Sequence, residues 1–146
     1  DVLDNAQPCG GSVATEVLLK LAIITGNEDY RIKATIPLAT LTELMARAPA
    51  GTGHWLAALD FYVSSPKEVV IIGPRNDPAT EALLQTVNAN FHPNKVLVGA
   101  EVSSDYALPL LEGRGMIDSK PTAYVCQNYA CQLPVTTPED LNSQLA

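Results

Sequence analysis

The chain has 146 residues, of which 47% are hydrophobic and 17% are charged, a composition typical of a folded domain rather than a disordered segment. Its formal net charge of -7 disfavours nucleic-acid backbones and anionic membranes, which attract clusters of Lys and Arg. The longest apolar stretch, residues 13–25, contains polar side chains and is too short to span a membrane. We therefore expect a globular protein without a nucleic-acid or membrane partner.

Three cysteines, at positions 9, 126 and 131, are too few for the disulfide framework of a small secreted protein. The chain opens without the charged and apolar segments of a signal peptide. These two features predict a cytoplasmic location. Because the first residue is Asp1 rather than methionine, we also expect the sequence to be a piece of a longer or processed chain.

Residues 1–65 predict a helical domain that begins with a loop rich in Gly, Pro, Asp and Asn. Ser12 is expected to cap the first helix, and Gly26 is expected to end it. Apolar side chains surround this helix on nearly every side, a pattern that predicts burial of most of its faces.

A second helix is expected to start at Asn27, and Pro37 should kink or split it because proline has no amide hydrogen to donate. Residues 54–63 predict a third, short helix. Three helices with short connections pack as antiparallel neighbours, but these expose more apolar surface than they can bury among themselves. We therefore expect packing partners outside the segment, and a homo-oligomer when it is isolated.

Residues 66–146 predict a small α/β domain. Strands are expected at residues 68–73, 95–99 and 122–126, and helices at residues 78–90 and 138–145. Asp77 and Thr137 should cap these two helices, each of which begins with a proline. The first two strands flank a crossover helix, so they should be parallel with a right-handed connection. The predicted fold class is α/β: about three N-terminal helices, then a small, mostly parallel, three-stranded sheet with flanking helices.

Cys126 and Cys131 are separated by four residues at the end of a predicted strand, so their sulfur atoms could meet in a disulfide or a redox couple. Their spacing differs from the C-x-x-C pair of thioredoxin-like sites. A zinc site would need two more ligands, and only His54 and His92 could supply them as histidines. Structural thiols, a reversible disulfide and a metal site all stay open; we assign the pair a candidate redox role and predict no metal or cofactor.

The strand–loop–helix segment at residues 72–80 lies where α/β sheets commonly bind ligands. Phosphate sites there favour glycine-rich loops, whereas this loop has one glycine, and Asp77 and Glu81 add negative charge. Ordinary helix capping is therefore the preferred interpretation. For His54, the alternatives are a capping or partly exposed side chain and a polar group that faces the interior of a helical barrel.

Motifs along the chain, DNAQPCGGSVA, HWLAALDF, EVVIIG and AYVCQNYACQLPVTTPEDL, follow the order of motifs in a known family. On these motifs the chain resembles the YyaL-type family of large thioredoxin-domain proteins, which includes the spermatogenesis-associated homologues. The resemblance implies that residues 1–65 are the C-terminal part of an (α/α)6 barrel similar to N-acylglucosamine 2-epimerases and six-hairpin glycosidases. It also implies that the partners are the remaining barrel and a thioredoxin-like domain of the parent chain.

The family's D-G-A-E-P-S-G-N-S loop falls on residues 4–12, and the resemblance makes Asp4, Gln7, Cys9 and His54 candidate catalytic residues. Gln7 replaces a carboxylate of the family loop, and an amide cannot serve as a general acid or base. We therefore expect a structural, catalytically inactive segment. The alternatives are a carbohydrate-acting barrel enzyme, epimerase- or glycosidase-like, with its site near residues 4–12, and a thiol redox module that uses Cys126 and Cys131.

Overall fold

The structure is a computed structural model that describes residues 2–101, 107–128 and 130–146. The chain divides into two compact units, Asp1–Ser65 (unit 1) and Pro66–Ala146 (unit 2). In the part of the chain that the structure describes, no helix combines the length and apolar character needed to cross a membrane.

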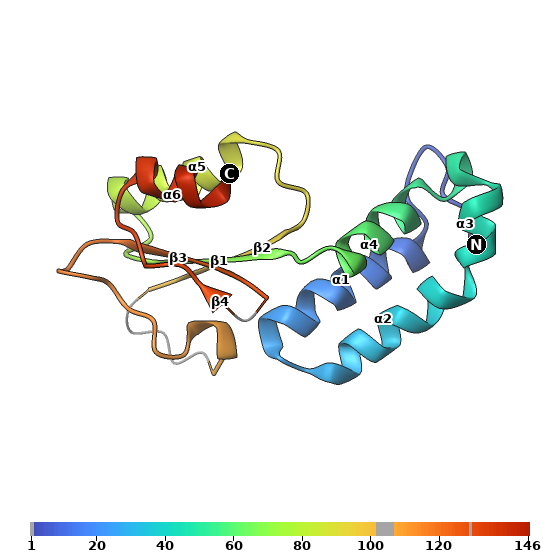
Figure 1. Cartoon of the computed structure of the whole chain (residues 1–146), viewed down its shortest axis with the longest axis horizontal. Coiled ribbons are helices and arrows are strands. Elements are labelled where there is room, and N and C mark those ends of the chain that lie inside the picture. Colours follow the sequence, from blue (N-terminus) through green and yellow to red (C-terminus); the bar gives the residue numbers. More distant parts are fainter. Residues whose placement is uncertain (1, 102–106, 129) are drawn as a thin grey trace. The chain divides into compact units, whose positions relative to one another are not determined.

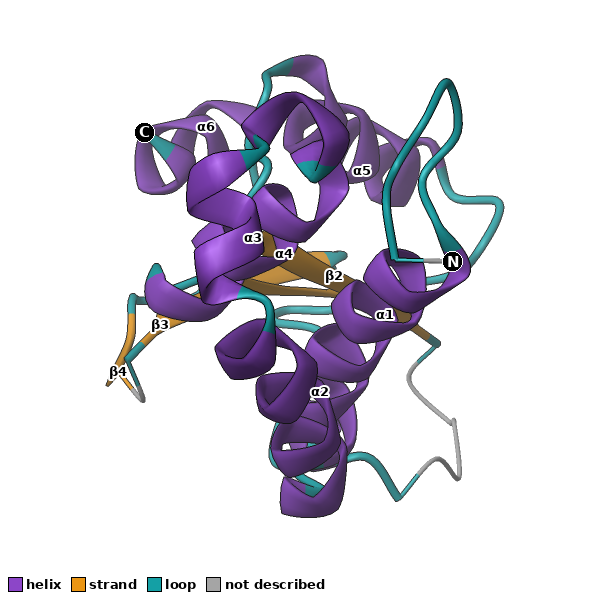
Figure 2. Cartoon of the chain, turned by 90° about the vertical axis from the view of Figure 1, so that its right-hand side faces the viewer, coloured by secondary structure: helices purple, strands orange, loops and turns teal. Residues whose placement is uncertain are grey.

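Unit 1 is helical (Figure 1). Its elements are α1 (Gly10–Thr25), α2 (Glu28–Thr40), α3 (Thr42–Arg47), the 3-10 helix η1 (Pro49–Gly51) and α4 (Gly53–Val63). Helix α1 packs against both α2 and α4 and lies between them (Figures 1 and 2). The buried side chains of these helices include Leu19 of α1, Leu38 of α2, and Trp55 and Phe61 of α4.

Helix α1 begins two residues before the expected cap. Its N-cap is Cys9, whose sulfur accepts a hydrogen bond from the backbone N–H of Ser12. Ser12 lies inside the helix, and its hydroxyl donates to a buried carboxylate that is described below. The predicted end is confirmed: Gly26 adopts a left-handed conformation with φ 66°, which glycine reaches without the steric cost that a side chain adds.

Asn27 caps α2 as predicted, and its side chain accepts a hydrogen bond of 2.9 Å from the N–H of Asp29. Pro37 was expected to kink or split the helix. The break lies about one turn after the proline. Helix α2 continues through Pro37 and stops at Leu41, whose N–H donates to the Pro37 carbonyl oxygen before α3 begins. The helical path is therefore split into α2 and α3.

The expectation that α1 is buried on most faces is wrong for this chain. Its buried residues, Ser12, Thr15 and Leu19, lie on one side, while Val13 and Val17 are 40% and 47% exposed. The physical reason is that α2 and α4 cover only part of the helix. Leu18, Leu21, Ile23 and Ile24 are half-buried, and Val13 and Val17 face solvent.

Unit 2 is an α/β fold with a mixed sheet of strand order β2-β1-β3-β4 in its described residues (Figure 1). Its strands are β1 (Lys67–Ile72), β2 (Lys95–Ala100), β3 (Thr122–Gln127) and β4 (Ala130–Cys131), and its helices are α5 (Pro78–Ala89), the 3-10 helix η2 (Pro109–Leu111) and α6 (Pro138–Leu145). The three predicted strands are confirmed, and β1 pairs with β2 in parallel as expected. The predicted helix caps, Asp77 for α5 and Thr137 for α6, are also confirmed.

The sheet is mixed where a mostly parallel one was expected, because β3 runs antiparallel to β1. Parallel pairing requires a crossover that returns the chain to the opposite end of the sheet. In its described residues, 107–121, the connection from β2 contains η2 as its only helix. It reaches β3 at the end where β1 finishes, so that Thr122 pairs with Ile72. Strand β4 was not predicted, since two residues are too few to show an alternating pattern.

The two faces of the sheet are covered differently. Helices α5 and α6 cover one face, where Val69 and Ile71 pack with Leu83, Val87 and Leu141. The alternate residues of each strand point to the other face, which the segment with η2 covers (Figure 1). Helix α5 ends at Ala89, and Phe91, which follows the helix, is 89% exposed.

Gly73, at the end of β1, is predicted to tolerate no side chain. A Cβ atom there would lie 2.4 Å from Thr80 Oγ1 and 2.9 Å from Pro121 Cβ. Gly73→Ala should therefore lower the free energy of unfolding by about 1–3 kcal/mol, measured by urea denaturation followed by circular dichroism. Gly99→Ala is the matched control, because nothing lies within 4 Å of a Cβ at that position; equal losses for both variants would contradict the packing.

Candidate functional site

The carboxylate of Asp4 is buried and joins the first turns of two helices. Its Oδ1 accepts hydrogen bonds of 2.8 Å from the N–H of Cys9 and the hydroxyl of Ser12, at the start of α1. Its Oδ2 accepts from the N–H groups of His54 at 2.8 Å and Trp55 at 3.3 Å, in the first turn of α4. A negative charge is favoured at both positions, because first-turn N–H groups lack helical partners and carry the positive end of the helix dipole.

The loop that carries Asp4 is tied to the same region by further hydrogen bonds. The N–H of Asp4 donates to the Gly51 carbonyl oxygen at 2.8 Å. The indole Nε1 of Trp55 donates to the Val2 carbonyl oxygen at 2.8 Å. The loop before α1 is therefore fixed against α4 by side-chain and backbone contacts together.

These contacts determine the pKa of Asp4. Burial alone would raise it, but the hydrogen bonds from Cys9, Ser12, His54 and Trp55 outweigh burial and lower the pKa from 3.8 to about 2. Asp4 is therefore ionised at neutral pH, with both oxygens occupied by donors. In this geometry it acts as a structural anion and has no proton to give.

Cys9 lies beside Asp4 and is also buried. Its sulfur is 3.5 Å from the Ser12 hydroxyl and 3.6 Å from the Val2 carbonyl oxygen. Burial and the nearby Asp4 charge raise the pKa of the thiol, but hydrogen bonds from Ser12 and Gly11 reverse the balance and lower it overall. The thiol is enclosed at the helix terminus, and its observed role is to cap α1.

The side chain of His54 points to a different partner from its backbone. Its Nε2 lies 2.9 Å from Oε2 of Glu16 on α1, with both side chains about a quarter exposed. Glu16 also pairs with Lys20 at 2.5 Å. Burial raises the pKa of Glu16, but Lys20 and His54 lower it overall, so the carboxylate is ionised at neutral pH.

Of the four candidate residues taken from the family loop, the structure brings three together. Asp4, Cys9 and the backbone of His54 form one hydrogen-bonded cluster, whereas Gln7 is exposed. Sequence reasoning missed Glu16 and Trp55 as members of this region. A Cβ at Gly11 would lie 3.0 Å from the Trp55 ring, so the small residue makes room for the indole.

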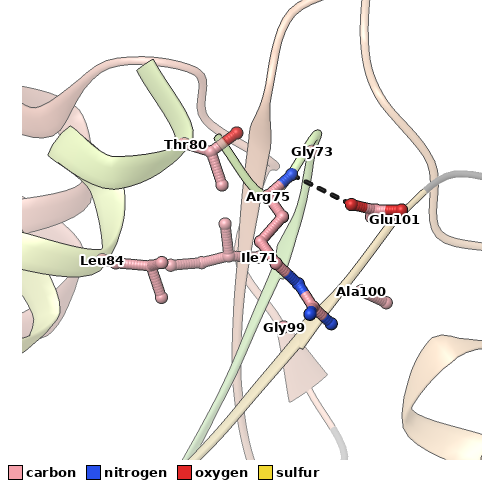
Figure 3. A pocket seen from close by; sticks show the side chains of 8 residues that line it. All are labelled: Ile71, Gly73, Arg75, Thr80, Leu84, Gly99, Ala100 and Glu101. Carbon is pink, nitrogen blue, oxygen red and sulfur yellow. Dashed lines mark hydrogen bonds between the residues drawn. The ribbon is translucent and has the colours of Figure 1, made fainter. Parts of the chain in front are cut away.

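A small cavity of about 170 Å³ lies at the carboxyl ends of β1 and β2, close to the start of α5. In Figure 3 the side chains of Ile71 and Leu84 form its apolar wall, and the Arg75 side chain extends toward Gly99. The backbone N–H of Arg75 donates to the Glu101 carboxylate at 3.2 Å, so an acidic side chain already occupies this donor. The arrangement gives no support to an anion site, in line with the sequence interpretation.

The second candidate pair is joined in the structure. Cys126 of β3 and Cys131 of β4 are cross-strand partners and form a disulfide. The Nη2 atom of Arg114 lies 3.1 Å from the Cys126 sulfur and 3.6 Å from the Cys131 sulfur. No signal in the sequence pointed to Arg114, because the residue is twelve positions away from Cys126 in an irregular segment.

Metal binding is not supported by the side chains seen here. Within residues 2–101, 107–128 and 130–146, no group of three or more His, Cys, Asp and Glu side chains lies close enough to hold an ion. His54 is engaged with Glu16 instead of a cysteine.

Comparison with known proteins identifies the family. The chain is 35% identical to human spermatogenesis-associated protein 20 and 33% identical to the rat protein, over 99% of its own length in both cases. The chain belongs to the spermatogenesis-associated protein 20 family. It spans 19% of the length of these curated relatives, so it corresponds to part of a larger protein.

An uncharacterised protein of Caenorhabditis elegans is 28% identical over 94% of the chain. No family model matches the sequence. No solved structure matches it either.

Asp4→Asn should destabilise unit 1. An amide cannot accept hydrogen bonds on both sides, and the NH2 group would meet N–H donors, so we expect a loss of roughly 2–4 kcal/mol at pH 7. The fluorescence of Trp55, the single tryptophan, reports urea unfolding of this unit. Glu43→Gln, which alters a highly exposed ion pair with Arg47, should change stability by less than about 0.5 kcal/mol.

The stability difference between the wild type and Asp4→Asn should depend on pH. A lowered pKa means that the Asp4 contribution is complete above the unfolded-state pKa near 3.8 and is lost as pH falls through about 2. The stability difference between wild type and Asp4→Asn should therefore shrink between pH 4 and pH 2, by about 1–2 kcal/mol. A difference that is constant over this range would contradict the assignment of the shift to Asp4.

Proposed function

We propose that this chain is a non-catalytic structural module of a longer protein and that exposed aliphatic side chains of unit 1 are packing sites for the rest of that protein. Two aliphatic pairs carry the proposal: Val13 and Val17 on α1, and Ile32 and Ile36 on α2. Each pair has the i, i+4 spacing that places side chains on one side of a helix. Their exposed fractions range from 40% to 61%.

The amount of exposed apolar surface favours a partner. Single exposed apolar residues are normal on a soluble protein, but here two helices that pack against each other each expose a pair of aliphatic side chains. Burial of the exposed halves of these four side chains would contribute roughly 3–5 kcal/mol. This is comparable to the marginal stability of a small domain.

The partner that covers these pairs is another part of the same parent polypeptide. Support comes from the relatives, of which the chain spans only 19%. The resemblance to (α/α)6 barrels suggests the type of neighbour, because helical hairpins in such a barrel bury their apolar faces on adjacent hairpins. The proposed partners are therefore the rest of the barrel and a thioredoxin-like domain of the parent chain. The proposed location of the parent protein is the cytoplasm.

The geometry around Asp4 favours a structural role for unit 1. Four donors of the protein reach its two carboxylate oxygens, and Cys9 caps a helix. Gln7 has no carboxyl group and is exposed. These residues hold the start of α1 against α4, a function that requires neither substrate nor cofactor.

A carbohydrate-acting barrel enzyme is the second candidate, and the Glu16–His54 pair favours it. The pair is partly exposed near the Asp4 loop, and an ionised Glu16 could act as a base or stabilise a positive charge. His54→Gln in the full-length parent protein should then reduce sugar turnover by 100-fold or more, while Lys33→Gln should leave it unchanged. A panel of sugars with no turnover by the full-length wild type would count heavily against this candidate.

The structural proposal predicts that the isolated chain self-associates through the aliphatic pairs. Light scattering at increasing concentration should give a mass above 15.5 kDa, and Ile36→Glu should shift it toward the monomer because a buried charge is costly. Lys33→Glu, on the same helix and already exposed, is the control. A clean wild-type monomer at high concentration would contradict the proposal.

A further inference from the structure

The β3–β4 hairpin itself brings the two sulfur atoms together. Cys126 and Cys131 are directly opposite each other in the antiparallel register. The N–H of Gln132 donates to the Val125 carbonyl oxygen at 2.9 Å, which makes the adjacent cysteine pair a non-hydrogen-bonded pair. Side chains approach more closely at such pairs than at hydrogen-bonded ones, so the disulfide follows from the strand register.

The two sulfur-bearing residues differ in access to solvent. Cys126 is only 2% exposed and lies under the segment that contains η2. Cys131 is an exposed residue on the two-residue strand β4. An external thiolate can approach Cys131 directly, whereas Cys126 is shielded by the protein.

Arg114 is held beside the buried sulfur from several directions. Its Nη1 donates to the Leu110 carbonyl oxygen, and its guanidinium carbon lies 5.6 Å from the centre of the Tyr124 ring. The Tyr124 hydroxyl in turn donates to the Gly115 carbonyl oxygen at 2.7 Å. The guanidinium position is therefore built into unit 2.

The stabilisation that this guanidinium gives to the neighbouring sulfur depends on the oxidation state of the cysteines. A disulfide sulfur is neutral and a weak acceptor, so it gains little from the cation. A thiolate in the same place would gain a charge-assisted hydrogen bond, which lowers the pKa of the thiol and makes it a better leaving group. Glu68, the cross-strand neighbour of Cys126 on β1, is a second charged group near Arg114: burial raises its pKa, and Arg114 opposes that shift.

We propose that Cys126 and Cys131 form a thiol–disulfide exchange site in which Arg114 sets the direction of attack. This inference goes beyond the structural role proposed above and does not depend on it. The expected reaction partner is a low-mass thiol or a dithiol. In a cytoplasmic setting, reducing thiols of this class are abundant.

The reaction proceeds in two balanced steps. An external thiolate attacks the Cys131 sulfur, a new sulfur–sulfur bond forms there, and the Cys126–Cys131 bond breaks. Cys126 leaves with the electron pair as a thiolate beside Arg114. A second external thiolate then attacks the sulfur of the first external thiol, which releases Cys131 as a thiolate and leaves the two external thiols oxidised to a disulfide.

The test is the rate at which dithiothreitol reduces the disulfide in the full 146-residue chain, followed by alkylation and mass spectrometry. Arg114→Gln should slow reduction by roughly 3–10-fold, because the Cys126 thiolate loses its cation. The reduction rate of Arg114→Lys should lie between the rates of the wild type and of Arg114→Gln. Arg47→Gln removes an exposed arginine of unit 1 and should leave the rate unchanged.

Whether the loss of Arg114 slows or accelerates reduction distinguishes a role in thiol exchange from a merely structural role. If Arg114 only packed the hairpin, its loss would expose Cys126 and accelerate reduction; a faster or unchanged rate would overturn the proposal. With glutathione as the probe, peptide mapping should locate the mixed disulfide on Cys131, and its location on Cys126 would also overturn the proposal. Three free thiols in the air-oxidised native chain would do the same.

Discussion

Unit 1 depends on one buried charge. The Asp4 carboxylate accepts hydrogen bonds from the first turns of α1 and α4, and its lowered pKa expresses how strongly these donors favour the ionised form. The loop before α1, the cap at Cys9 and the packing of Trp55 over Gly11 all meet at this point. Donors at helix N-termini, a type of group that binds anionic ligands in other proteins, here hold two helices together.

Much of the fold could be predicted because local chemistry and the final structure agree. Asn27, Asp77 and Thr137 cap the helices that their sequence contexts indicated, and the apolar run of β1 is buried at the centre of its sheet. The orientation of β3 could not be predicted, because it depends on where an irregular connection ends. The exposure of α1 could not be predicted either, because the spacing of apolar residues does not show how many other elements pack against the helix.

The sites were harder to predict because they depend on contacts between distant residues. The loop motif identified Asp4 and Cys9, but only the fold shows that residues fifty positions away donate to the Asp4 carboxylate. Likewise, the spacing of Cys126 and Cys131 allowed a disulfide without requiring one. The guanidinium of Arg114 reaches them from a segment with no periodic pattern, so sequence reasoning had no signal for it.

In our proposal, this chain is a module of a larger protein whose other parts cover the aliphatic pairs of unit 1. The most direct test is the mass of the native polypeptide in its source cells, detected with an antibody against this segment. We expect a band several times larger than 15.5 kDa, because the chain spans only 19% of its relatives. A native band near 15.5 kDa would show that the segment stands alone and would contradict the account.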